Sequence, residues 1–248
     1  MIKIVSYKIC PFVQRVTALL EAKNIPYEIE FISLSNKPRW FLDIAPNGQV
    51  PVLITESGTA LFESDAIVEY IDEVTNPLEA DVSAEQRAID RAWSYQAAKH
   101  YLVQCSAMRS ISEETLQERA ENLGKAFAKA ERYLTRFAGG SDKTESGSYF
   151  KGASLSNVDI AWLPLLHRAA IIEQYTRYDF LANYPNVKNW QKALLGTGLA
   201  EKSVSEDFEQ VFTEFYLSEK TYLGNDKKYS CTTVGQSSVE SCSTESCC

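Results

Sequence analysis

The sequence predicts two domains, a mixed α/β domain followed by an all-α helical bundle, and two observations lead to this prediction. Residues 1–77 alternate strand and helix patterns, whereas the apolar residues from 84 to about 222 recur only at helical spacing. The change of pattern falls just after Asn76-Pro77, where a short connection is expected. A mixed part and an all-helical part that follow each other along the chain argue for separate domains. We therefore expect domains over 1–77 and 83–224, packed closely because the linker is short.

In the first domain the expected order of elements is β-α-β-α-β-β-α. A strand, a helix and a second strand in succession form a βαβ unit. The turn Glu56-Ser57-Gly58 joins two later strands, so the sheet should be mixed. The expected strands cover 3–7, 27–32, 50–54 and 59–62, and the expected helices cover 13–23, 38–42 (a short turn) and 64–74.

The second domain should consist of helices alone. Helical periodicity runs over 84–108, 113–137 and 157–172, and continues in shorter pieces to about 222. Ser156 and Asp159 stand at the start of the third helix with the spacing of a capping box, which typically contributes about 1 kcal/mol. We therefore expect Asp159 to stabilise a helix and keep it out of the catalytic residues.

The charge of the chain argues against nucleic acid and acidic membrane surfaces as partners. The formal net charge is −8, and no cluster of Lys and Arg offsets it. The first residues follow a strand pattern without the basic start of a secretory signal, and no apolar run approaches the roughly 20 residues that span a bilayer. We expect a cytoplasmic protein with reduced thiols. Only His100 and His167 could serve as imidazole ligands, so no metal site built from histidines is expected.

Residues 225–248 form a tail rich in Ser, Thr and Cys, with almost no large apolar side chains to offset its ordering entropy. We expect this tail to be disordered. A metal site, a disulfide and prenylation are alternatives, although the spacing matches no standard zinc pattern and Glu245 stands where the four-residue lipidation motif needs cysteine. The tail cysteines are Cys231, Cys242, Cys247 and Cys248.

Cys10 lies between the first expected strand and the first expected helix, in the segment Ile-Cys-Pro-Phe-Val-Gln-Arg. Pro11 suits the first helical position, because its φ is preset and it lacks an N–H that would be unpaired there. Cys10 is then close to the N-cap, where thiols typically have a pKa of about 3.5–7.5 instead of about 8.5. Cys10 is therefore a candidate nucleophile, although a free cysteine more commonly acts as a small buried apolar residue, as we expect of Cys105.

The segment Pro46-Asn47-Gly48-Gln49-Val50-Pro51-Val52-Leu53 places a turn before a strand that opens with Val-Pro. Proline removes a donor from a β-ladder and so occurs at the start or edge of a strand, and a tight X-Pro junction is a candidate for a cis bond. A cis bond would turn the Val50 N–H and C=O outward, where an extended peptide could pair with them. An ordinary turn followed by an edge strand is the alternative.

A strand is expected to end at Glu63-Ser64, and a helix follows at once. Ser64 is a natural N-cap, and the free N–H groups of such a helix end bind anions such as a carboxylate. Glu63 could pair with an ammonium group. Together the two residues could hold an α-amino acid head group, and simple helix capping is the alternative.

Four segments in this order resemble the glutathione transferase superfamily: Cys-Pro-Phe-X-X-Arg, Asn-Lys-Pro-X-Trp-Phe, Pro-Asn-Gly-X-Val-Pro-Val-Leu and Glu-Ser-X-Ala-Ile. The resemblance covers about residues 1–222 and implies a thioredoxin-like first domain, glutathione as co-substrate and a homodimer. The cysteine of the first segment makes the chain similar to the omega-like branch, which implies that Cys10 is catalytic. Tyr7 is its rival, because other branches use a tyrosine near the end of the first strand.

The resemblance also implies a glutathione site. The Val50 backbone before Pro51 would pair with the cysteinyl part of glutathione, and Glu63 with Ser64 would hold its γ-glutamyl end. A lysine would reach the glycyl carboxylate, and two apolar residues would line the site. The implied glutathione-binding residues are Phe12, Leu34, Lys37, Val50, Pro51, Glu63 and Ser64.

The implied activity is thiol transfer through the Cys10 thiolate, which includes deglutathionylation, dehydroascorbate-type reduction and conjugation of electrophiles. A non-enzymatic binding or regulatory protein of this fold is one alternative, and a specialised glutathione-dependent dehalogenase or hydroquinone reductase is another. The second substrate, an electrophile or a mixed disulfide, should lie between the domains against an apolar wall. Candidates for that wall are His100, Tyr101, Arg109 and Trp162.

Overall fold

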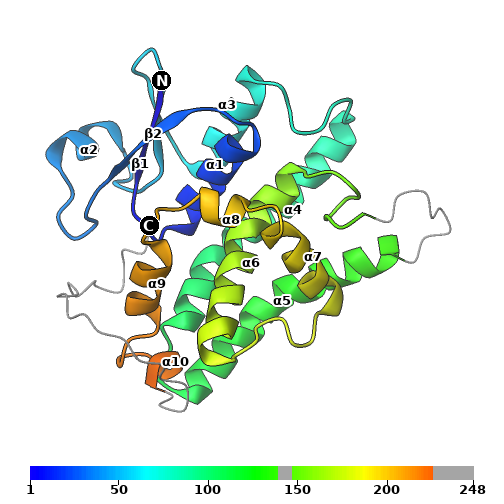
Figure 1. Ribbon diagram of the computed structural model, residues 1–248. Coiled ribbons are helices and arrows are strands. Elements are labelled where there is room, and N and C mark those ends of the chain that lie inside the picture. The colour runs from blue at the N-terminus through cyan, green and yellow to red at the C-terminus, as the bar shows by residue number, and fades with distance from the viewer. Residues whose placement is uncertain (139–146, 226–248) are drawn as a thin grey trace.

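The computed structural model describes residues 1–138 and 147–225, in which a sheet domain is joined to a helical domain (Figure 1). The predicted fold class, a thioredoxin-like α/β domain followed by an all-α domain, is confirmed. The sheet domain contains β1 (Ile2–Ser6), α1 (Pro11–Ala22), β2 (Tyr27–Phe31), α2 (Arg39–Ile44), β3 (Val52–Ile54), β4 (Ala60–Phe62) and α3 (Ser64–Val74). The helical domain contains α4 (Ala84–Met108), α5 (Glu113–Ala138), α6 (Asn157–Thr176), α7 (Pro185–Leu195), α8 (Leu199–Lys202), α9 (Phe208–Tyr216) and α10 (Tyr222–Asn225).

The sheet has the strand order β2-β1-β3-β4. β1 and β2 are parallel, as a βαβ unit requires, whereas β3 and β4 are antiparallel. β3 also runs antiparallel to β1, with Ile4 opposite Leu53. The strand predicted over 50–54 begins only at Val52, because Pro51 has no N–H to donate to the ladder.

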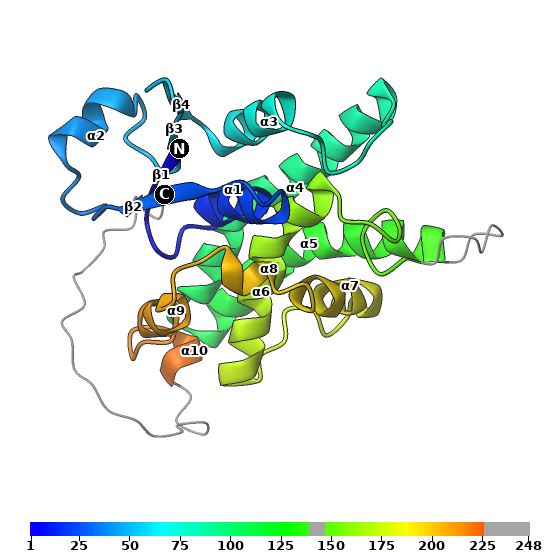
Figure 2. The same cartoon turned by 45° about the horizontal axis from the view of Figure 1, so that its top comes forward.

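Helix α1 lies between the sheet and the helical domain, so most of its sides are buried (Figure 2). Its polar side chains bond to the helical domain. The Thr17 hydroxyl donates to the carbonyl of Ser203 at 2.6 Å, and Nε2 of Gln14 lies 2.9 Å from Nδ1 of His167. Buried hydrogen bonds therefore join the two domains along α1.

An aromatic cluster fills the interior of the helical domain. The ring of Trp162 lies 5.5 Å from that of Trp190 and 6.3 Å from that of Phe127. Phe150, in the loop before α6, stacks on Tyr133 of α5 at 4.5 Å. Such ring pairs contribute roughly 0.5–1.5 kcal/mol each beyond the area they bury, so this cluster helps to hold α5, α6 and α7 together.

The predicted capping box at the start of α6 is confirmed. The Ser156 N–H donates to Oδ2 of Asp159 at 2.9 Å, and the Asp159 N–H donates to the Ser156 hydroxyl at 3.4 Å. Two further donors reach the buried Oδ1, the Phe150 N–H at 2.9 Å and the Trp190 indole N–H at 2.7 Å. Asp159 therefore anchors α7 and the loop before α6 as well as capping its own helix.

The domain boundaries stay a prediction, although α3 ends at Val74 and α4 begins at Ala84, on either side of the expected linker. The disorder predicted for the tail lies outside the described residues, apart from Asn225 at the end of α10. The four tail cysteines also lie outside them.

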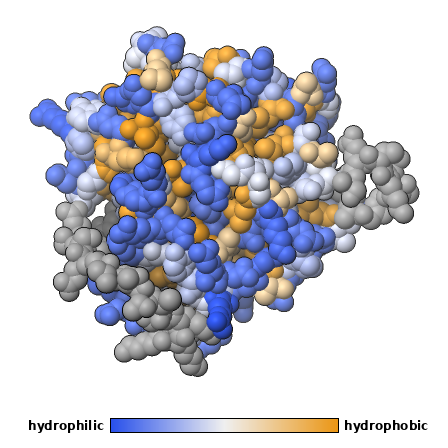
Figure 3. Space-filling view, in the orientation of Figure 1, coloured by the Kyte–Doolittle hydropathy of each residue, from blue (hydrophilic) through white to orange (hydrophobic). Residues whose placement is uncertain are grey.

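The surface is mixed in character. On the face shown in Figure 3, hydrophobic residues occur in small areas separated by hydrophilic ones. Across the described ranges, 1–138 and 147–225, no helix has the length and apolar character needed to cross a bilayer.

We expect Asp159→Ala to lower the free energy of unfolding by at least about 3 kcal/mol, because four buried donor groups lose their acceptor at once. Ser156→Ala is the matched control and should cost only about 1 kcal/mol, since it removes the cap and leaves the carboxylate in place. Urea denaturation of the two variants measures the difference. Equal losses for both would show that the bonds to Phe150 and Trp190 add nothing.

Candidate active site

Cys10 is the N-cap residue of α1, and Pro11 occupies the first helical position, as the sequence predicted. The Cys10 N–H donates to the Tyr7 carbonyl at 3.0 Å, and the Gln14 N–H donates to the Cys10 carbonyl at 3.2 Å. The Cys10 side chain is 2% exposed, and its Sγ lies 4.0 Å from the carbonyl oxygen of Val50. The thiol is thus located at the positive end of the α1 dipole, against the start of β3.

A cavity of about 180 Å³ is bordered by Val50. The Val50–Pro51 peptide bond is cis, which is one of the two arrangements that the sequence left open. Five of the seven residues implied for glutathione binding line this cavity together, and Cys10 lies just behind the lining. The complete lining is Phe12, Ala45, Asn47, Gln49, Val50, Pro51, Phe62, Glu63, Ser64 and Leu102.

Glu63 occupies an unusual backbone conformation at the edge of this cavity. Its φ is 67°, in the left-handed region that favours glycine. Glu63 is the N-cap of α3. Ser64, which the sequence predicted to be the N-cap, is instead the first helical residue, because the positive φ of Glu63 takes that residue out of the helix. No side chain caps this helix end, so its first N–H groups are available to an anion.

The Glu63 carboxylate is held from one side by Asn47. The side-chain amide of Asn47 donates to Oε1 of Glu63 at 2.8 Å, and both residues line the cavity. The bond connects the loop before the cis-proline to the start of α3. Sequence reasoning quoted Asn47 within a motif but gave it no role, because its partner lies 16 positions away.

Two of the residues implied for the glutathione site lie outside the cavity lining. Nζ of Lys37 is close to the same loop, 3.8 Å from the point where a Cβ on Gly48 would be. Gly48 has a φ of 59°, so glycine suits this turn. Leu34 is buried in the core.

The structure corrects two of the residues predicted for the second-substrate wall. Tyr101 is 0% exposed, and its ring packs edge-on against Phe12 at 4.9 Å. Trp162 is also fully buried, inside the aromatic cluster. Both predictions are wrong, because neither side chain reaches a surface that a substrate could touch.

The other two residues predicted for the wall, His100 and Arg109, are not among the residues that line the cavity. Nδ1 of His100 lies 2.6 Å from the carbonyl of Gln96, one turn earlier on α4. The Arg109 guanidinium lies 5.7 Å from the centre of the Phe215 ring on α9. Their contact with a second substrate stays a prediction.

Leu102 is the cavity residue of the helical domain that sequence reasoning missed. It is 48% exposed and stands next to the buried Tyr101 on α4. Tyr101, Cys105 and Met108 mark the buried face of α4. Leu102 is a large apolar residue that lies off this face, and that position was the signal that could have identified it.

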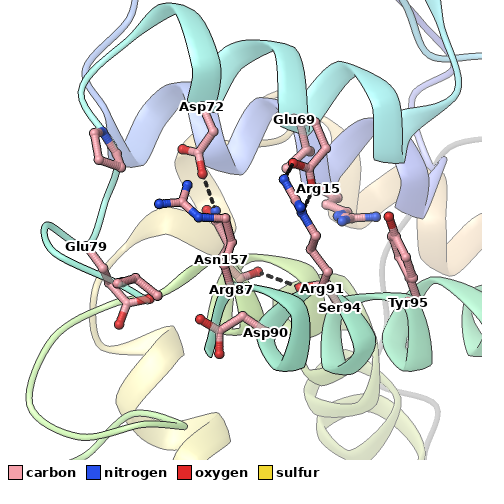
Figure 4. Close-up of a pocket in the computed structure, with 13 residues that line it drawn as sticks. Arg15, Glu69, Asp72, Glu79, Arg87, Asp90, Arg91, Ser94, Tyr95 and Asn157 are labelled. Carbon is pink, nitrogen blue, oxygen red and sulfur yellow. Dashed lines mark hydrogen bonds and ion pairs between the residues drawn. The ribbon is translucent and has the colours of Figure 1, made fainter. Parts of the chain in front are cut away.

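A second pocket of about 40 Å³, room for a few water molecules, lies between α3 and α4 (Figure 4). Charged and polar residues of α3 meet residues of α4 and α6 across it. Nε of Arg91 donates to Glu69 at 2.8 Å, and the Asn157 amide donates to Asp72. These paired groups connect the two domains, so we assign the pocket a structural role.

The fold and the cavity beside Cys10 define the class of the protein. It is a two-domain protein of the thioredoxin-fold class, with a cysteine at the start of its first helix and a cis-proline beside that cysteine. The cavity is lined mainly by residues of the sheet domain, and Leu102 of α4 borders it from the helical domain.

Comparison with known proteins identifies the family. Residues 9–74 match the family described as "Glutathione S-transferase, N-terminal domain". Glutathione S-transferase omega-1 of Sus scrofa is 31% identical over 79% of this chain and 77% of its own length. Glutathione S-transferase DHAR2 of Arabidopsis thaliana is 31% identical over 75% of this chain and 79% of its own length. Glutathione transferase Omega 3C of Trametes versicolor, a solved structure, matches with a TM-score of 0.68 at 26% identity, covering 88% of this chain and 91% of that one.

The chain belongs to the glutathione S-transferase family, as an omega-like member of this family of enzymes. The resemblance expected from the four sequence segments is thereby confirmed.

Proposed function

We propose that this enzyme catalyses glutathione-dependent thiol transfer with Cys10 as the nucleophile. The observation that supports the proposal most is the position of the Cys10 thiol at the N-terminus of α1, 4.0 Å from the Val50 carbonyl that borders the cavity. Free N–H groups and the helix dipole favour a thiolate there. The names of the relatives, glutathione S-transferase omega-1 and DHAR2, agree with glutathione as the co-substrate.

In the proposed complex, glutathione lies along the cavity with its cysteinyl backbone paired to Val50. Its γ-glutamyl ammonium faces Glu63, and the adjacent carboxylate receives the N–H groups at the start of α3, where Ser64 lies. Lys37 reaches the glycyl carboxylate from beside Gly48. Phe12 provides an apolar contact at the cavity wall.

The proposed reaction is two successive thiol–disulfide exchanges. The Cys10 thiolate attacks the glutathionyl sulfur of a mixed disulfide, the old S–S bond breaks, and the leaving thiolate takes up a proton. The thiolate of a second glutathione then attacks the Cys10–glutathione disulfide, which releases oxidised glutathione and restores the Cys10 thiolate. Dehydroascorbate-type reduction would instead consume two reduced glutathione molecules, which supply two electrons and two protons and leave as one oxidised glutathione.

The second substrate in this proposal is a small electrophile or a mixed disulfide. Conjugation of electrophiles is the weaker activity, because a cysteine tends to join glutathione covalently instead of stabilising its thiolate. A glutathione-dependent dehalogenase or hydroquinone reductase would use the same covalent step, and a comparison of rates across these substrates separates the two possibilities. The exchange requires reduced glutathione, so a cytoplasmic location is part of the proposal.

Cys10→Ala should lose thiol exchange, because the attacking sulfur is removed. Cys10→Ser should also lose exchange but gain conjugation of an electrophile, since a hydroxyl can stabilise the glutathione thiolate without joining it. Steady-state assays with a glutathione mixed disulfide and with an aromatic halide measure the two activities. Cys105→Ala and Tyr7→Phe are the controls, and both should retain exchange. Full exchange activity in Cys10→Ala would refute the mechanism, and loss in Tyr7→Phe alone would assign it to the rival residue.

Asn47→Ala should raise the KM for glutathione about twofold to tenfold and leave kcat nearly unchanged. Its amide holds Oε1 of Glu63, and a hydrogen bond of this kind is worth about 0.5–1.5 kcal/mol. Cysteinylglycine, which lacks the γ-glutamyl group, is the control substrate, and its KM should not change. An equal rise for both substrates would contradict a role at the γ-glutamyl end.

We also propose that the chain forms a homodimer, the usual state expected from the family resemblance. Light scattering should give a mass close to twice the chain mass of 27.9 kDa. A mass equal to one chain at micromolar concentration would rule this out.

A further inference from the structure

Arg168 of α6 is 0% exposed although it carries a permanent charge. Its Nη2 donates to the Ile9 carbonyl at 3.0 Å. Its Nη1 donates to the Pro164 carbonyl at 3.1 Å and to the side-chain oxygen of Gln14. The guanidinium also lies 5.4 Å from the centre of the Phe208 ring. All of these partners are neutral.

The other charged side chains around the start of α1 are matched in pairs. Lys8 pairs with Asp207, and Arg15 pairs with Asp65. In the part of the chain that the structure describes, Arg168 makes no ion pair with a carboxylate. Arg168 therefore places a positive charge without a carboxylate partner next to the backbone that leads into α1.

The titratable groups nearby do not balance that charge. Burial raises the pKa of Tyr101, so its hydroxyl is neutral near pH 7. Burial, with a contribution from the charge of Arg168, lowers the pKa of His167 to about 3, so this ring is neutral as well. The charges of Arg15, Arg168, Asp65 and Cys10 all act on the Tyr101 hydroxyl, so the Arg15–Asp65 pair, Arg168 and Cys10 lie in one electrostatic neighbourhood.

A buried charge without a partner of opposite sign destabilises the folded chain. A thiolate on Cys10 would supply the missing negative charge. The bond to Ile9 also fixes the backbone one residue before Cys10, across 159 positions of sequence.

We propose that Arg168 is a positioning residue for Cys10, which holds the turn into α1 through the Ile9 carbonyl and favours the thiolate through its unpaired charge. The inference rests on the proposed role of Cys10 and adds to it a residue from the other domain. Arg168 does not touch the substrate in this account; it acts only through Cys10 and the backbone next to it.

The test compares Arg168→Met, Arg168→Gln and Arg168→Lys in the full chain. Alkylation of Cys10 by iodoacetamide is followed from pH 5 to pH 10 by peptide-resolved mass spectrometry, because the chain has 6 cysteines. The pH midpoint of the alkylation rate should rise by about one unit in the Met and Gln variants, with a roughly tenfold lower rate below that midpoint. Arg168→Lys keeps the charge and should return the midpoint toward that of the wild type.

Lys188→Met is the matched control, because Lys188 of α7 is also partly buried and pairs with Glu173 and Asp179. It should lower the melting temperature without moving the alkylation midpoint. Arg168→Gln retains a donor for the Ile9 carbonyl and carries the test if the Met variant does not fold. An unchanged midpoint in a folded neutral variant would overturn the proposal for Arg168 alone. A wild-type midpoint near 8.5 would instead refute the activated Cys10 thiol and thus the proposed function.

Discussion

The burial of α1 between two domains is the constraint on which the rest of the structure depends. A helix in this position cannot leave its polar side chains to water, and an unpaired buried polar group costs about 1–3 kcal/mol. Gln14 and Thr17 therefore take their partners from the helical domain, at His167 and Ser203. The helix that begins at Cys10 is consequently fixed to both domains, and any shift between the domains would move the thiol.

The exposed edge of the cavity and the thiol behind its lining differ in how they are held. The side chains of Asn47 and Glu63 are exposed and bond to each other across the cavity edge, so water can replace that bond at modest cost. Cys10 is buried, and its surroundings are fixed by bonds that water cannot replace. Such an arrangement suits a site in which one end recognises a solvated head group while the other controls the reactivity of a sulfur.

Local patterns in the sequence predicted most of the fold and the location of the candidate site in the sheet domain. Ser64–Val74 and Ala84–Met108 have the predicted bounds, because clear boundary residues flank them, such as Ser83, whose side chain caps α4. The helix expected to end at 172 continues to Thr176, since it stops only where Arg177 adopts a left-handed conformation that no sequence rule requires. The contacts of Arg168 could not be predicted, because they depend on how two domains pack and not on any neighbouring residue.

The rotation of α4 about its axis explains why the second-substrate wall was misjudged. Neighbouring residues on a helix point about 100° apart, so a helix that buries Tyr101 must turn Leu102 toward the cleft. The rotation is fixed by the Tyr101 hydroxyl, which donates to the Ala161 carbonyl on α6, and by the edge of its ring against Phe12. Tyr101 thus affects the cavity lining without being part of it. Its ring packs against Phe12, and its burial leaves Leu102 to face the cavity. Helical spacing alone identifies a buried face but not the element that covers it, and here that element is α1 with α6.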